Sequence, residues 1–135
     1  MAGIEMVVAV VFIRDYKVLL LTHGKDGIWK FPGGGIETPF ETTVFLDVAM
    51  AKVKKELGVG METRQHPFPV YSIIDGLGGR KELIILHFLA HLIGDIKPGE
   101  GITDHIWFPI DELWKVHKGP NVETAIEHFG FIKPN

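Results

Sequence analysis

With 135 residues, of which 46% are hydrophobic and 23% charged, the chain has room for one globular domain with a real core and too little for two. Its formal net charge of -3 excludes a general electrostatic attraction to nucleic acid polymers or to an anionic membrane, so any phosphate binding has to come from a local site. The absence of cysteine excludes disulfides, thiolate metal sites and cysteine nucleophiles, and it agrees with a cytoplasmic location.

The first quarter of the chain predicts extended segments separated by turns. Residues 6–13 are apolar and rich in valine without interruption, which is typical of a strand covered on both faces. This run is too short to cross a bilayer and lacks the features of a signal peptide, so we expect no membrane association. Residues 18–22 are a second apolar run and complete a predicted hairpin. A short extended piece over 28–31 ends at Pro32.

One long helix is predicted between the three glycines at 33–35 and Gly58. Thr38-Pro39-Phe40-Glu41 has the pattern of a capping box, with Thr38 as the N-cap and Glu41 at the third helical position. Gly58 is a natural C-terminal stop. The face expected to pack on the sheet is an apolar stripe with spacings of 4, 3 and 4, formed by Leu46, Met50, Val53 and Leu57.

The second half of the chain alternates further strand patterns with short helix patterns. Strands are predicted at 69–74, 83–93 and 105–108, and the glycine-rich segment 75–79 joins the first two as a hairpin. Short helices are predicted at 111–116 and 121–128. No internal repeat, low-complexity tract or linker interrupts this order. We therefore expect a single mixed α/β domain over residues 1–135.

His87 and His91 have a spacing that would suit a zinc site if the segment were helical. The segment has the pattern of a strand, in which the two imidazoles would lie about 13 Å apart at ~3.3 Å per residue. That separation excludes a shared zinc ion.

The order of these segments and three of their motifs resemble the Nudix family. The motifs are Trp29-Lys30-Phe31-Pro32-Gly33-Gly34-Gly35-Ile36-Glu37, Val53-Lys54-Lys55-Glu56-Leu57-Gly58-Val59 and Trp107-Phe108-Pro109-Ile110-Asp111-Glu112-Leu113. The resemblance implies a Nudix fold of the α/β (α+β) class, with a mixed β-sheet sandwiched between helices. It also implies hydrolysis of a nucleoside diphosphate linked to another group, with Mg²⁺ or Mn²⁺ as the metal.

The family's signature, G-x5-E-x7-R-E-U-x-E-E-x-G-U with U aliphatic, serves a plain physical need. A diphosphate is densely anionic, so attack by water requires divalent cations that neutralise charge and activate the nucleophile. Mg²⁺ takes hard oxygen ligands, and glutamates three or four residues apart supply them from one helix face.

This chain departs from the signature at the metal ligands. Anchored on Glu56-Leu57-Gly58-Val59, the family's arginine becomes Ala51, and two of its ligand glutamates become Lys52 and Lys55. Glu56 alone remains as a metal ligand and catalytic candidate. The charge of the face changes from about -3 to about +1, and like charges repel a cation by ~1–4 kcal/mol per pair in wet surroundings. We therefore expect an atypical, impaired metal site.

The spacing before this segment leaves two alignments open. Gly35 to Glu41 fits the signature, but Glu41 to Ala51 is two residues longer than the family's interval. A two-residue insertion in the early helix would keep Glu41 as a catalytic candidate beside Glu56. A longer helix starting at Thr38 would make Glu41 only a cap. The capping box favours the longer helix.

Two functional hypotheses follow. In one, the protein is a hydrolase whose metal ligands come from Glu37, Glu41, Glu56 and Asp104. In the other, it is a non-catalytic nucleotide-binding or structural protein. Lys52, Lys55 and the amides of Gly34 and Gly35 would then hold a phosphate without metal. A solvated helix face would also account for the lysines.

Three further residues are substrate-binding candidates. Asp104 lies three residues before Trp107, where Nudix proteins often carry an acidic residue near the substrate. Trp29 and Phe31 flank the expected cleft and are candidates to stack on a base, although half-buried strand aromatics have the same pattern. The expected partner is a small-molecule nucleotide or diphosphate. A homodimer through the apolar faces of the late strands stays open.

Overall fold

The computed structural model describes residues 4–22, 24, 27–36, 44–63, 66–76, 79–99 and 101–131. Its elements, in chain order, are β1 (Ile4–Arg14), β2 (Lys17–Thr22), β3 (Gly33–Gly35), α1 (Phe45–Leu57), β4 (Gly60–Thr63), β5 (Phe68–Gly76), β6 (Gly79–Ile93), β7 (Asp104–Pro109), the 3-10 helix η2 (Ile110–Lys115) and α2 (Val122–His128). Within these described ranges, no helix is long and apolar enough to span a membrane.

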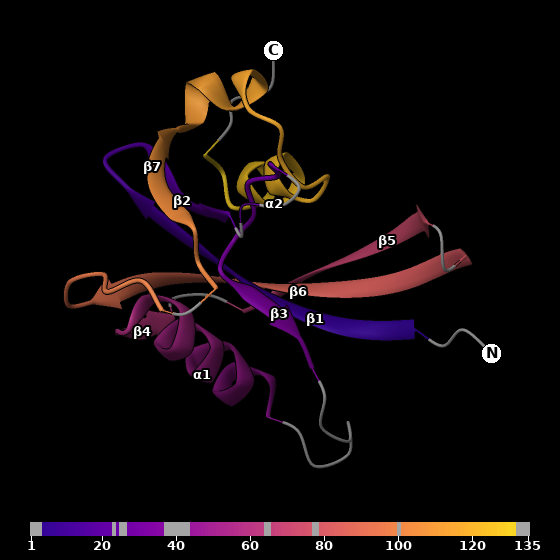
Figure 1. Cartoon of the computed structure of the whole chain (residues 1–135), viewed down its shortest axis with the longest axis horizontal. Coiled ribbons are helices and arrows are strands. Elements are labelled where there is room, and N and C mark those ends of the chain that lie inside the picture. The colour runs from indigo at the N-terminus through magenta and orange to yellow at the C-terminus, as the bar shows by residue number, and fades with distance from the viewer. Residues whose placement is uncertain are drawn as a thin grey trace.

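β1 is the central strand of a mixed sheet with the order β4-β6-β1-β2-β7. It pairs in parallel with β6 and antiparallel with β3, and its far end forms a hairpin with β2. β2 pairs with β7, while β4 and β5 pair with two successive stretches of β6. Figure 1 shows β5, β6 and β1 running side by side on the right of the molecule.

Helices cover both faces of the sheet, as the family resemblance implied. Alternate residues of β1 enter two separate cores, with Val10 in the core under α1 and Val11 in the core under η2 and α2. Figure 1 shows α1 and α2 on opposite sides of β1. The expected mixed sheet between helices is confirmed, and so are both predicted hairpins.

The helix α1 begins later than the capping box predicted. Its N-cap is Val44, an extended residue without a side-chain cap, and the helix starts at Phe45. The prediction of one continuous helix from Thr38 is therefore wrong, and Thr38 to Glu41 lie outside the described residues. The C-terminus agrees with the prediction, because Gly58 adopts a left-handed φ of 70° and donates its N–H to the Lys54 carbonyl.

The buried stripe of α1 also differs from the prediction by one residue. Met50 is 40% exposed, whereas Ala49 is fully buried together with Val53 and Leu57. Spacings of four residues keep these three side chains on one face. The small side chain of Ala49 suits close approach to the sheet, and the long flexible Met50 is left at the edge of the contact.

Candidate functional site

The glycine strand β3 lies directly on β1, and only glycine fits at its start. Gly33 has a φ of 140°, and a Cβ built there would lie 2.0 Å from the Val8 carbonyl oxygen. Gly34 pairs with Val8 in the same ladder. The backbone of β3 is thus held close to the sheet.

The last turns of α1 face this strand. The Gly33 N–H donates to Glu56 Oε1 over 2.7 Å. Lys52 is one turn earlier on the same helix face, and a Cβ on Gly34 would lie 3.4 Å from Lys52 Cδ and 3.6 Å from Lys52 Nζ. The structure therefore brings Gly33, Gly34, Lys52 and Glu56 together.

The other predicted phosphate contacts are less enclosed. Lys55 is exposed, and it is the Lys55 backbone that packs near Gly99, where a Cβ would lie 2.0 Å from the Lys55 carbonyl oxygen. Gly35 is exposed, with open space where a Cβ would be. Lys52 thus lies across the glycine strand, while Lys55 faces solvent.

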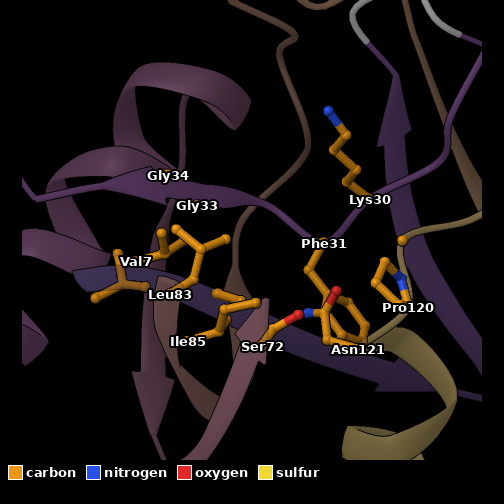
Figure 2. A pocket seen from close by; sticks show the side chains of 13 residues that line it. Val7, Lys30, Phe31, Gly33, Gly34, Ser72, Leu83, Ile85, Pro120 and Asn121 are labelled. Carbon is orange, nitrogen blue, oxygen red and sulfur yellow. The ribbon is translucent and has the colours of Figure 1, made fainter. Parts of the chain in front are cut away.

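A cavity of about 350 Å³ opens on the same glycine strand. Figure 2 shows Gly33, Gly34 and Val7 at one side of it and Phe31 and Asn121 at the other. Its walls are mostly apolar, including Leu83 and Ile85, and its polar side chains are Lys30, Ser72 and Asn121. Volume and lining are both typical of a small-molecule site.

The two aromatic candidates take different positions. Phe31 lines the cavity, is 8% exposed and meets the His87 ring edge to face at 5.8 Å. Trp29 is absent from the cavity wall and packs against the core under α2. Its N–H donates to the His117 carbonyl, and its own carbonyl accepts from the Gly119 N–H, so Trp29 anchors the segment before α2.

The predicted acids are not gathered around Glu56 within the described part of the chain. Asp104 is exposed at the start of β7, where its Oδ1 accepts the His105 N–H over 2.8 Å. Asp104 does not line the cavity. Glu37 and Glu41 lie outside the described residues. Among the residues that are described, no group of three or more histidine, aspartate or glutamate side chains is placed to hold a metal.

A buried histidine, His87, lies behind the cavity, and its spacing from His91 suggested no role other than the excluded zinc site. His87 is fully buried, while His91 is exposed on the same strand. Nδ1 of His87 lies 3.0 Å from the Phe68 carbonyl oxygen, and Nε2 lies 2.8 Å from Asn121 Nδ2. Burial lowers the pKa of His87, although its backbone hydrogen bonds oppose that shift. A polar residue inside an apolar strand was the only signal in the sequence.

A sequence model of the NUDIX domain matches residues 4–128. A NUDIX hydrolase from Nitrosomonas europaea shares 23% identity and a TM-score of 0.78, over 98% of this chain and 93% of that chain. A MutT NUDIX hydrolase from Burkholderia pseudomallei shares 22% identity and a TM-score of 0.77, over 93% of this chain and 97% of that chain. The ORF135 protein of E. coli shares 19% identity and a TM-score of 0.72, over 95% and 89%. No curated protein matches the sequence.

Proposed function

The chain belongs to the Nudix hydrolase family, and from that premise we propose that it binds a nucleoside diphosphate or a compound linked to one, without a metal ion. The diphosphate would lie against the glycine strand beside Lys52, and the base would enter the cavity. One observation carries the proposal, namely that Gly34 lines the cavity and that a Cβ built on it would lie 3.4 Å from Lys52 Cδ, so the Lys52 side chain passes close to a residue of the cavity wall.

The proposed phosphate-binding part of this site depends on the charge of Lys52 and on the exposed backbone of the glycine strand. Lys52 extends along Gly34, so its ammonium group can meet an anion that approaches the strand. A lysine ammonium recognises phosphate as a compact point charge. The absence of side chains on β3 lets the anion approach the backbone closely.

The proposed base-binding part of this site depends on the size of the cavity and on its apolar walls. A cavity of about 350 Å³ lies within the range of pockets that hold small molecules. Phe31 and Ile85 supply apolar walls, and Ser72 and Asn121 supply polar contacts. We expect the base to lie against Phe31 and its polar edge to reach Asn121.

The described residues do not fit the divalent metal that the family uses. Glu56 faces the glycine strand and accepts the Gly33 N–H, and among the described residues no group of three or more histidine, aspartate or glutamate side chains is placed to hold a metal. Lys52, one turn away, places a positive charge where the signature has a ligand. At surface-like dielectric that charge opposes a cation by ~1–4 kcal/mol. Hydrolysis of the diphosphate is accordingly expected to be slow or absent.

Metal-dependent hydrolysis is the second candidate function, and the position of Glu56 favours it. Glu56 aligns with a ligand position of the family's signature, and its carboxylate accepts the Gly33 N–H of the glycine strand. Glu37 and Glu41 would have to complete the ligand set. Turnover would then require Mg²⁺ or Mn²⁺ and the ionised Glu56 carboxylate.

A pair of charge reversals on α1 tests the proposal. Binding of ADP and ADP-ribose is measured by calorimetry in EDTA for the wild type, Lys52→Glu and Lys54→Glu. Lys54 is an exposed lysine two positions away and serves as the matched control. Lys52→Glu is expected to weaken binding by about tenfold or more, and Lys54→Glu by less than about twofold.

The opposing result is equally concrete. Hydrolysis of ADP-ribose that needs Mg²⁺ or Mn²⁺ and disappears in Glu56→Gln would overturn metal-free binding as the function. Equal loss of affinity in Lys52→Glu and Lys54→Glu would also contradict it, because a diffuse surface charge would then explain the binding.

A further inference from the structure

The hairpin of β5 and β6 leaves one edge of the sheet open. β5 pairs with β6 along one side over its whole length, and among the described residues no strand pairs with its other side. Figure 1 shows β5 and β6 extending to the right of the molecule, past α1 and α2. The backbone N–H and C=O groups at such an edge can pair with a strand of another molecule.

A proline in β5 indicates which residues direct their backbone away from β6. Residues of an antiparallel strand alternate between positions that bond the partner strand and positions that point away from it. Proline has no N–H to donate, so Pro69, opposite Leu86, fits a position that points away from β6. Alternation then directs the N–H and C=O groups of Tyr71 and Ile73 outward as well.

Tyr71 and Ile73 also carry exposed apolar side chains. They are 53% and 42% exposed. The Tyr71 hydroxyl donates to Glu82, which lies opposite Ile73 on β6, so both side chains lie on the same face of the sheet. Ser72, between them, faces the other way and lines the cavity. The outer edge of β5 thus combines an outward-directed backbone with exposed apolar side chains.

β5 also lacks the charges found on the other edges of the sheet. Natural proteins place charged side chains on edge strands, which prevents pairing with a second chain. The edge strands β4 and β7 carry the exposed acids Glu62 and Asp104, whereas residues 68–74 of β5 contain no charged residue. A second copy of this segment would therefore meet no like charge in the middle of the strand.

From these observations we infer that two copies of the chain associate through β5, as antiparallel neighbours around a two-fold axis at Ser72. This register places Tyr71 opposite Ile73 of the second copy, and each such pair exchanges two backbone hydrogen bonds. A pairing centred on Tyr71 would instead set Pro69 opposite Ile73 and lose a hydrogen bond at each proline. Aromatic and β-branched side chains that lie opposite each other stabilise antiparallel strands.

The area of this interface predicts a weak dimer. The 9 residues of β5 span about 30 Å at ~3.4 Å per residue, and a sheet with its side chains is about 10 Å thick. The strip buried on each copy is then about 300 Å², below the ~800 Å² per partner of a standard stable interface. We therefore expect reversible association at micromolar or higher concentrations. Pairing requires no ligand, so the inference does not depend on the proposed function.

Sedimentation velocity of the full chain, from micromolar to near-millimolar concentration, is the first test. The wild type is expected to shift reversibly from monomer to dimer. Ile73→Lys places a charge on the paired edge and should raise the dimer dissociation constant about tenfold or more. Ile4→Lys is the matched control, because Ile4 is 47% exposed and lies on the same face of the sheet but on β1. It should change the dissociation constant by less than about twofold.

Two results of this experiment would overturn the inference. One is a wild type that stays monomeric over the whole range. The other is equal weakening in Ile4→Lys and Ile73→Lys, because packing between sheet faces would then account for the dimer.

The absence of cysteine allows a second test with single introduced thiols. At the proposed axis the two copies of Ser72 form a non-hydrogen-bonded pair with Cα atoms about 4.5 Å apart, which suits a disulfide. Under mild oxidation Ser72→Cys should form a covalent dimer, and adding Ile73→Lys should prevent it. Ile93→Cys, which is exposed at the end of β6, should stay monomeric. No covalent dimer in Ser72→Cys, or equal cross-linking in Ile93→Cys, would contradict pairing through β5.

Discussion

Acidification should destabilise the fold through His87, which is fully buried. Burial lowers the pKa of His87 below its usual 6.5, and the nearby His128 adds a smaller unfavourable charge. The unfolded chain therefore binds a proton at a pH where folded His87 remains neutral. Stability contributed by neutral His87 is fully present above about pH 6.5 and is lost as the pH falls from there toward the lower folded pKa.

The magnitude follows from the linkage slope. One proton taken up only by the unfolded state changes the free energy of unfolding by up to about 1.4 kcal/mol for each pH unit. His87→Gln removes this term because glutamine does not titrate. His91→Gln is the matched control, since His91 is exposed on the same strand.

Urea denaturation from pH 7.5 to 5 measures this effect directly. The wild type and His91→Gln are expected to lose stability below pH 6.5 with parallel slopes. His87→Gln is expected to be less stable at pH 7.5 but to show a flatter dependence below 6.5. Parallel curves for His87→Gln and the wild type would refute the reasoning, because His87 would then titrate alike in the folded and unfolded chains.

Two further predictions concern the scaffold of the site. Gly33→Ala should destabilise the protein by about 3 kcal/mol or more, because its Cβ would meet the Val8 carbonyl at 2.0 Å, while Gly35→Ala, with open space around it, should cost less than about 1 kcal/mol. Thermal unfolding of both variants compares them, and equal losses would contradict the close packing of β3. Leu57→Ala should cost about 2–5 kcal/mol and exposed Met50→Ala less than about 0.5 kcal/mol, since only Leu57 is fully buried. A larger loss of stability in Met50→Ala would indicate that Met50 belongs to the buried face of α1, as the sequence predicted.

Much of the fold could be predicted because its signals are local. The valine-rich run of β1 is buried on both faces, and the glycine after α1 adopts the left-handed conformation expected of a helix stop. The N-terminus of α1 and its buried face were predicted less well from the capping box and the apolar periodicity. A capping box indicates that a helix can start, whereas α1 begins at Phe45, directly after the extended residue Val44.

The site was only partly predictable because its contacts are long-range. The sequence placed Lys52 and Glu56 on one helix face, and both meet the glycine strand, as periodicity alone could suggest. The periodicity did not separate Lys52 from exposed Lys55. The pairing of His87 with Asn121 crosses from one element to another and left no pattern in either segment.

Metal dependence of nucleotide affinity is the most direct test of metal-free binding. The dissociation constant of ADP for the wild type is measured by calorimetry in EDTA and again with Mg²⁺, with Lys52→Glu measured in parallel. We expect the dissociation constant of the wild type in EDTA to be at most about twofold larger than that with Mg²⁺. The reason is that Lys52 supplies the positive charge beside Gly34. Binding that appears only with Mg²⁺, or that strengthens about tenfold with it and survives Lys52→Glu, would contradict the account.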